Sequence, residues 1–288
     1  LDLYSNIDAL IDDINSVERH IPSKWEWLDE CLGGGFLEAG KSLYVFAGET
    51  NIGKSIFLGN IAHNIAKEGK NVLLVTLEMS ELLYARRICS NVTKVPLKEM
   101  VGNTPAIKQA IKDEDGKIFI KEFPPSTITA SQLKGFIKKF QEQGIKLDAI
   151  VLDYLNLMHS TMGNNSYERI KHVTEQVRAM SYLFNCPIIS ATQLNRAGFD
   201  TDNPDLATIS ESIGLAATAD VICSIFQNEE DRELGIIRLG MMKNRYGPRG
   251  NTQAMRINYS TLTIEEADDI EFDDDSDETL NMLAGLAQ

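Results

Sequence analysis

The sequence contains no hydrophobic run of membrane-spanning length and no recognisable secretion signal. Its 288 residues, of which 43% are hydrophobic, include no stretch near the roughly 18 consecutive apolar residues that a bilayer span requires. The first four residues, Leu1 to Tyr4, lack the basic-then-apolar order of a signal peptide. We therefore expect a globular protein of one large or two small domains, with no membrane partner.

Cysteine is also scarce. The four cysteines, Cys31, Cys89, Cys186 and Cys223, lie too far apart in the sequence to form a zinc-binding pair or a CxxC redox pair. This spacing favours free thiols and a reducing, cytoplasmic setting. Because the chain begins with Leu1 rather than methionine, we expect it to be a fragment of a longer protein.

Acidic residues outnumber basic ones, but the excess is concentrated near the C-terminus. The formal net charge of −14 ordinarily argues against a nucleic-acid partner. Ten acidic residues, however, fall between Glu265 and Glu278, and without them the rest of the chain carries a formal charge of only −4. We interpret residues 263–288 as an acidic, disordered tail. The apolar residues from Leu280 to Leu286 make this tail either a tethered interaction motif or a solubilising end.

Strand-like and helix-like segments alternate along most of the chain. Short apolar runs are expected to be strands, and the longer amphipathic segments between them helices. The expected strands are 42–46, 71–77, 117–120, 149–152, 187–191, 221–226, 236–242 and 253–257, and the main helices are 55–67, 81–90, 131–143 and 167–184. This pattern predicts an α/β fold with a mostly parallel central sheet, helices on both faces and a C-terminal β-hairpin, within one domain over residues 21–262.

Residues 1–20 precede this domain as an expected linker helix. Leu3, Ile7 and Leu10 recur at helical spacing before Pro22 ends the pattern. The helix either packs on the core of its own domain or docks on a neighbouring subunit, and the sequence favours neither.

The sequence GETNIGKS, between an expected strand and an expected helix, matches the P-loop pattern in full. Its glycines permit the tight turn that directs backbone N–H groups at phosphates, at the positive end of a helix. The lysine reaches the β- and γ-phosphates, and the serine hydroxyl binds Mg²⁺. We therefore predict ATP and Mg²⁺ as cofactors. The predicted nucleotide-binding residues are Gly48, Glu49, Thr50, Asn51, Ile52, Gly53, Lys54 and Ser55.

Three polar residues follow expected strands and are candidates for the same site, because ligands bind at the carboxyl ends of parallel strands. Asp153 ends an apolar strand and is predicted to hold Mg²⁺ together with Ser55, rather than to serve as a turn or cap residue. Glu78 is a candidate base for the attacking water, the alternative being a helix N-terminal acid. Gln193 is either a sensor of the γ-phosphate or simply a polar strand end.

Five motifs occur in the order of the helicase motifs of the DnaB family. They are GETNIGKS, LEMS at 77–80, IVLDY at 150–154, SATQLNR at 190–196 and KNRYGPRG at 243–250. The P-loop alone is generic, whereas SATQLNR followed by KNRYGPRG is specific. Most of residues 20–262 thus resembles the RecA-like motor domain of these replicative hexameric helicases, and TNIGKS and LEMSE are most similar to the T4-type phage members.

The resemblance implies an activity, an assembly and partners. A family member hydrolyses ATP in a homohexamer, moves 5′ to 3′ along single-stranded DNA and unwinds duplex at the replication fork. Primase, a helicase loader, a polymerase or a single-strand-binding protein are the implied protein partners. The setting would be the cytoplasm of a host bacterium if the protein is phage-encoded. The family's N-terminal domain is not recognisable, so we expect the motor region and its linker.

The resemblance also assigns site residues. It implies catalytic roles for Lys54, Glu78, Gln193, Lys243 and Arg245. Lys243 and Arg245 match the pair that the family inserts into the neighbouring subunit's ATP site. They follow an expected strand and precede the turn at 247–250, so we expect them to project from a rigid hairpin. An arginine supplied in trans is typically worth roughly 10³–10⁵ in rate. Without the resemblance, such a basic turn is an ordinary solvated surface.

Two loops, 159–166 and 195–212, are candidates for holding single-stranded DNA. Neither is strongly basic and neither offers an aromatic stacking platform, so mobile surface loops are the alternative. We favour DNA contact because both loops begin where the ATP chemistry ends, and six copies around a channel would multiply a modest contact. The candidate DNA-binding residues are Asn164, Asn165, Arg169, Lys171 and Arg196.

Two other classes of protein fit parts of this pattern. A strand-exchange recombinase or clock-type ATPase shares the core, and it is distinguished by the spacing of LEMS, QLNR and KNRYG and by whether the protein unwinds forked DNA. A nucleotide-gated loader or scaffold without unwinding activity would bind ATP but show little turnover stimulated by single-stranded DNA.

Overall fold

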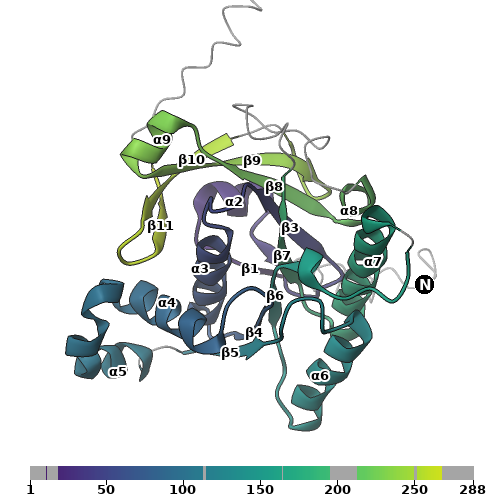
Figure 1. Ribbon diagram of the computed structural model, residues 1–288, viewed down its shortest axis with the longest axis horizontal. Helices are drawn as coiled ribbons and strands as arrows, with labels where there is room; N and C mark the ends of the chain where they lie inside the picture. The colour runs from purple at the N-terminus through teal and green to yellow at the C-terminus, as the bar shows by residue number, and fades with distance from the viewer. Residues whose placement is uncertain are drawn as a thin grey trace, which may run out of the picture.

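The computed structural model describes residues 11, 19–112, 115–163, 165–194, 213–249 and 252–267. Within these residues the centre is a nine-stranded sheet in the order β11-β10-β9-β8-β3-β7-β6-β4-β5 (Figure 1). The six strands from β8 to β5 are parallel, and the last three in the chain run antiparallel. The parallel strands are β3 (Leu43–Gly48), β4 (Asn71–Thr76), β5 (Lys117–Glu122), β6 (Ala149–Asp153), β7 (Ile188–Gln193) and β8 (Val221–Phe226). The antiparallel strands are β9 (Ile236–Asn244), β10 (Thr252–Asn258) and β11 (Thr263–Glu266).

Helices cover both faces of this sheet. Helices α3 (Lys54–Lys67) and α4 (Glu81–Thr93) lie on one face, and α6 (Ala130–Glu142) and α7 (Ser166–Phe184) lie on the other (Figure 1). Strand β3 shows why. Its alternate residues join two separate apolar clusters, Tyr44 with the α3 and α4 side and Val45 with the α6 and α7 side. A strand buried on both faces must be apolar throughout, which explains the unbroken apolar run before the P-loop.

Shorter elements complete the domain. They are α2 (Glu26–Cys31), α5 (Thr104–Lys112), α8 (Ile213–Thr218), α9 (Glu229–Leu234), the 3₁₀ helices η1 (Leu97–Asn103) and η2 (Leu155–Leu157), and a ribbon of β1 (His20–Ile21) with β2 (Phe36–Leu37). None of the described helices combines the length and apolar character that crossing a bilayer needs.

The predicted architecture is confirmed. Every expected strand and main helix is present, with ends shifted by a few residues, and β9 and β10 form the expected hairpin. The sequence did not indicate the amphipathic helix α5, which buries none of its residues, or the strand β11.

Strand β11 lies in the segment that the sequence assigns to the acidic tail. Its Ile264 N–H donates to Asn60 Oδ1 at 3.1 Å. The Glu266 carboxylate accepts the backbone N–H groups of Glu26 and Trp27 at 2.8 Å each, at the N-terminus of α2. The folded domain therefore extends beyond residue 262, because an acid counted with the tail has a structural partner in the domain.

Several predictions fall outside the described residues and stay predictions. The first is the linker helix over 1–20, of which only residues 11, 19 and 20 are described. The others are Asn164, the loop 195–212 with Arg196, and the tail beyond residue 267.

Asn60 offers a test of how β11 is held. Its side chain donates to Leu262 O at 2.9 Å and accepts from Ile264 and from Asn91 Nδ2, the latter at 2.7 Å. We expect Asn60→Ala to lower the free energy of unfolding in urea by about 2 kcal/mol, because buried polar groups lose their partners. Asn64→Ala is the control, since half-buried Asn64 makes one bond, to Ser23 O. Equal losses for both variants would contradict this account.

Candidate nucleotide-binding site

The P-loop connects the end of β3 to the start of α3, as the sequence predicts. A Cβ atom on Gly48 would lie 2.8 Å from a side-chain carbon of Ile52 and 2.9 Å from Ile225 O, so no larger residue fits. Gly53 has a φ of 101° immediately before α3 begins. The loop therefore leads directly into the N-terminus of a 14-residue helix, and this geometry suits the binding of a phosphate group.

Lys54 lies at the first residue of α3 and points back into the loop. Its ammonium donates to Gly48 O at 3.0 Å and to Glu49 O at 2.5 Å. Burial lowers its pKa, and the nearby carboxylates of Glu78 and Asp153 act in the opposite direction. This cation is thus held among groups that belong to the predicted ATP site.

Asp153, at the end of β6, is a buried carboxylate whose charge is only partly compensated. Its side chain is fully buried, and within the described part of the chain neither oxygen has a hydrogen bond of normal geometry. Burial raises its pKa to about 6, and the charge of Glu78 adds to the rise, while the hydroxyls of Ser55 and Tyr84 and the charge of Lys54 lower it. A buried carboxylate of this kind favours a bound cation.

The residues around Asp153 fit Mg²⁺. The Tyr84 hydroxyl donates to Ser55 O at 2.8 Å and fixes the first turn of α3 beside the carboxylate. Within the described residues, no three His, Cys, Asp or Glu side chains converge as a metal cage. Mg²⁺ does not need such a cage, since it is usually held by one or two protein oxygens together with water and substrate phosphates.

Glu78 and Gln193 lie at the same edge of the sheet as the P-loop. Glu78 is exposed on the turn after β4, and that turn is fixed by Thr76, whose hydroxyl accepts from Met79 N at 3.1 Å. Gln193 pairs with Gly48 across β7 and β3, and its Nε2 donates to Thr50 Oγ1 at 2.5 Å. The structure therefore brings both residues to the edge of the sheet that carries the P-loop, and Gln193 contacts the loop directly.

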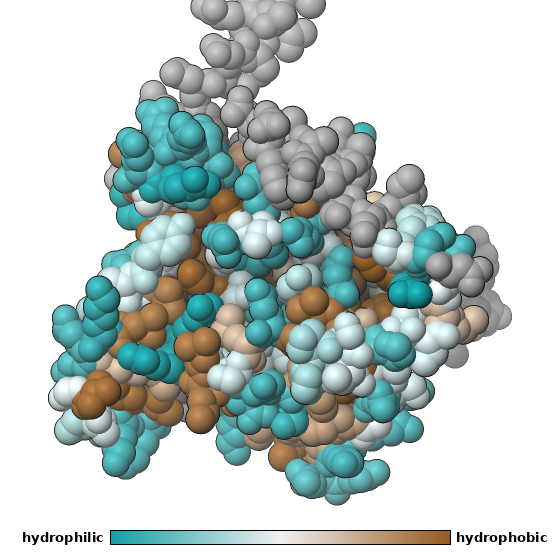
Figure 2. Space-filling view, viewed as in Figure 1, coloured by the Kyte–Doolittle hydropathy of each residue, from teal (hydrophilic) through white to brown (hydrophobic). Residues whose placement is uncertain are grey.

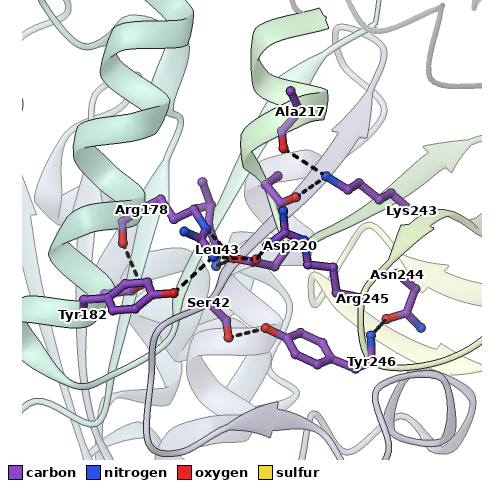
Figure 3. A network of polar contacts seen from close by, with 12 residues as sticks. Ser42, Leu43, Arg178, Tyr182, Ala217, Asp220, Lys243, Asn244, Arg245 and Tyr246 are labelled. Atoms are coloured by element: carbon purple, nitrogen blue, oxygen red, sulfur yellow. Dashed lines mark hydrogen bonds and ion pairs between the residues drawn. The ribbon is translucent and has the colours of Figure 1, made fainter.

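Lys243 and Arg245 lie elsewhere, beside the amino-terminal end of β3. Lys243 Nζ donates to the carbonyls of Ala216 and Ala219 at 2.7 Å each and to that of Ala217 at 3.3 Å, at the C-terminal end of α8 (Figure 3). Burial lowers its pKa, and the charge of Arg245 adds to this. Arg245 Nη1 donates to Asp220 Oδ1 at 2.8 Å. The cations are therefore bound to their own chain rather than projecting freely, which the sequence did not indicate.

The candidate DNA-binding residues that are described lie at the start of α7. The Asn165 side chain caps this helix by accepting from Glu168 N at 2.8 Å. Arg169 is exposed, bonds Gly163 O at 3.3 Å, and lines a pocket of about 330 Å³ together with His159. Lys171 is half exposed, and its Nζ lies 3.9 Å from Glu175 Oε1. Exposed basic groups are compatible with DNA contact, whereas Asn165 already has a structural role.

Comparison with known proteins identifies the family. A family model described as the DnaB-like helicase C-terminal domain matches residues 20–263. The chain belongs to this family. The resemblance drawn from the five motifs is thereby confirmed, and the family model covers all the site residues described above.

The relatives share moderate identity over most of the chain. The DnaB-like replicative helicase of Enterobacteria phage T4 is 26% identical over 286 residues, which cover 94% of this chain and 59% of that protein. The replicative DNA helicase DnaB of Geobacillus stearothermophilus is 26% identical over 269 residues, or 87% of this chain and 57% of that protein. The chain thus spans less than two thirds of these curated relatives.

Solved structures agree on the fold. A structure titled "ATPase Domain of G40P" has a TM-score of 0.78 at 19% identity and covers 93% of this chain and 100% of that one. A structure of a DnaB-like replicative helicase, whose title also names its interactions with primase, has a TM-score of 0.78 at 17% identity and covers 93% and 69%. The expected RecA-like ATPase fold is confirmed.

The sequence did not indicate three residues of these networks, namely Tyr84, Arg178 and Asp220. Tyr84 lies one turn after the LEMS motif, and only its helical spacing from Ser80 hints that it faces the P-loop. Asp220 precedes an apolar strand instead of following one, and its partners Arg178 and Arg245 are 42 and 25 residues away. No local pattern connects residues so far apart.

Asp153 makes the stability of the domain depend on pH. Because its pKa is raised from 3.8 to about 6, ionisation costs the folded state up to about 3 kcal/mol above pH 6, and the cost disappears as pH falls towards 4. We expect Asp153→Asn to raise the melting temperature in Mg²⁺-free buffer at about pH 7.5, and to do so much less near pH 4.5. A gain that is the same at both pH values would show that the carboxylate charge is not its source.

Proposed function

We propose that this chain is the motor domain of a replicative DNA helicase. It hydrolyses ATP at the subunit interfaces of a hexameric ring, moves 5′ to 3′ along single-stranded DNA, and unwinds duplex at the replication fork. One observation carries the proposal: the P-loop and the cationic hairpin occupy opposite edges of one sheet.

The strand register supports this separation. Gly48 pairs with Ile225 at one end of β8, and Val221 at the other end pairs with Asn244 of β9. The four residue steps from Val221 to Ile225 correspond to roughly 13 Å of extended strand. Arg245 therefore cannot reach the P-loop of its own chain while the sheet is intact, and its contribution to hydrolysis would go to a neighbouring subunit.

Each residue of the nucleotide site then has a defined task. Ser55 and Asp153 would hold Mg²⁺, which neutralises charge on the β- and γ-phosphates when it is bound. Lys54 would exchange the loop carbonyls for phosphate oxygens, and Glu78 would accept a proton from the attacking water. Gln193 contacts Thr50 of the P-loop and is followed directly by loop 195–212, so it is suited to relay nucleotide state to DNA.

An exposed apolar surface supports assembly. Leu82 of α4 is 84% exposed and Val101 of η1 is 86% exposed, with Ile111 of α5 close to half exposed. Figure 2 shows apolar side chains gathered on this face, over α4 and α5. Exposed apolar side chains gathered on one face are typical of a contact with another polypeptide.

DNA and partner proteins complete the proposal. Arg169, Lys171, Asn165, Asn164 and Arg196 are the candidate DNA contacts, and binding through phosphates should weaken as salt rises. Primase, a loader, a polymerase or a single-strand-binding protein are the proposed protein partners. A title among the related structures names primase for that helicase. The proposed setting is the cytoplasm, that of a bacterial host if the protein is phage-encoded.

Two substitutions separate the halves of the site. We expect Lys54→Ala to abolish ATP hydrolysis and to weaken nucleotide binding. Arg245→Ala should reduce DNA-stimulated hydrolysis by about 10³-fold while nucleotide binding, measured with a fluorescent ATP analogue, stays unchanged. Full DNA-stimulated hydrolysis by assembled Arg245→Ala protein would contradict the role in trans.

A forked-DNA assay tests the activity itself. The full-length protein should unwind a fork carrying a 5′ single-stranded arm in the presence of ATP and Mg²⁺, and mass measurement should detect a hexamer. A protein that binds ATP and assembles but shows neither unwinding nor DNA-stimulated turnover would be a nucleotide-gated scaffold. DNA-stimulated turnover without unwinding would favour the recombinase or clock-type class.

A further inference from the structure

Asp220 lies at the centre of a polar network at the edge of the sheet opposite the P-loop (Figure 3). Its side chain is 1% exposed. Oδ2 accepts from Leu43 N at 3.0 Å and from Arg178 Nε at 2.9 Å, and Oδ1 accepts from Arg178 Nη2 at 2.9 Å and from Arg245 Nη1 at 2.8 Å. The carboxylate therefore joins three parts of the domain: the start of β3, helix α7 and the hairpin after β9.

Contacts other than the one with Arg245 already fix the orientation of the Asp220 carboxylate. Arg178 binds it through two parallel hydrogen bonds, a geometry that sets the plane of both groups. The N–H of the fully buried Leu43 donates to one oxygen of the carboxylate. Arg178 is itself braced, since its Nη2 donates to the Tyr182 hydroxyl at 3.3 Å and its guanidinium lies 5.3 Å from the Tyr182 ring. Oδ1 thus offers Arg245 an acceptor in a defined direction.

Among the described residues, the charges around Asp220 do not balance. One bidentate arginine already neutralises Asp220, so Arg245 adds a positive charge that the carboxylate does not require. Arg245 is 48% exposed and, among the described residues, only Nη1 of its guanidinium has a hydrogen-bond partner. A half-exposed arginine with unused donors is suited to bind an anionic group such as a phosphate.

Lys243 differs from Arg245 in this respect. Its ammonium donates to three carbonyls at the C-terminal end of α8, which accounts for all its donors. The neighbouring side chains anchor the hairpin: Asn244 donates to Cys31 O at 2.6 Å, and the Tyr246 and Ser42 hydroxyls are 2.6 Å apart. Arg245 is therefore the one cation of this pair with donors left to offer.

We propose that Asp220 is a positioning residue for ATP hydrolysis: it holds Arg245 so that the free side of the guanidinium faces the neighbouring subunit's ATP site. The inference rests on the proposed function, because it requires Arg245 to act in trans. Arg178 is the second member of this arrangement. Since it belongs to α7, whose first turns carry the candidate DNA contacts Arg169 and Lys171, the network also links the hairpin to the helix that begins at the end of the candidate DNA loop 159–166.

Asp220→Asn tests the proposal, with Asp231→Asn as the matched control. Asp231 is 2% exposed and is held by Arg238 through two hydrogen bonds of 2.8 Å, but it lies near the other end of β9, away from Arg245. In assembled full-length protein, Asp220→Asn should lower kcat for DNA-stimulated hydrolysis by about 10- to 100-fold with KM for ATP unchanged, because a misplaced catalytic group loses rate without losing binding. Asp231→Asn should stay within about 2-fold of wild type.

A double variant identifies the path of the effect. If Asp220 acts through Arg245, then Asp220→Asn should cause no further loss of kcat in an Arg245→Ala background. If Asp220→Asn does not fold, Arg178→Lys provides the test, since it keeps the charge but loses the paired hydrogen bonds, and it should lower kcat by about 3- to 10-fold.

The outcomes separate the two proposals. Full activity of Arg245→Ala would contradict the proposed trans role. An inactive Arg245→Ala with a fully active Asp220→Asn would overturn only the positioning role. Higher activity of Asp220→Asn than of wild type would also overturn it, because Asp220 would then restrain Arg245 instead of presenting it.

Discussion

Strand direction is the constraint on which the rest of this structure depends. Because the central strands are parallel, their carboxyl ends meet at one edge, and the P-loop, Glu78, Asp153 and Gln193 lie together there. The chain reverses only after β8, so β9 returns Lys243 and Arg245 to the opposite edge. In the function that we propose, these two groups of residues are the two halves of one ATPase site. They cannot meet within one chain, and a ring of identical subunits would join them.

Two buried aspartates show how the domain treats charge at its two edges. Asp220 receives four hydrogen bonds and two arginines, so its burial is fully compensated. Asp153 receives none of normal geometry from the described residues, and burial raises its pKa to about 6. The first arrangement favours a rigid structural role, and the second favours a group that becomes stable only when a cation binds. The ionised Asp153 carboxylate thus lowers the stability of the folded domain, and the same incompletely compensated charge suits its proposed role in binding Mg²⁺.

Much of the fold and part of the site could be predicted from the sequence, for identifiable reasons. Buried parallel strands are apolar throughout, and Gly48 and Lys54 belong to a loop whose spacing is dictated by phosphate geometry. The acids and amide after the strands could be placed because strand ends converge. The bonds of Arg245 and of Glu266 could not, because they join residues far apart in the chain and depend on side-chain packing. Ionic partners of this kind leave no local pattern.

Mixing two inactive variants tests the central claim most directly. Lys54→Ala subunits lack a working P-loop but keep Arg245, whereas Arg245→Ala subunits have the reverse defect. If one ATP site is shared by two subunits, rings co-assembled from equal amounts should recover about a quarter of the wild-type DNA-stimulated ATPase rate, because one interface in four combines both intact halves. Co-assembled rings that remain as inactive as either variant alone would contradict the account.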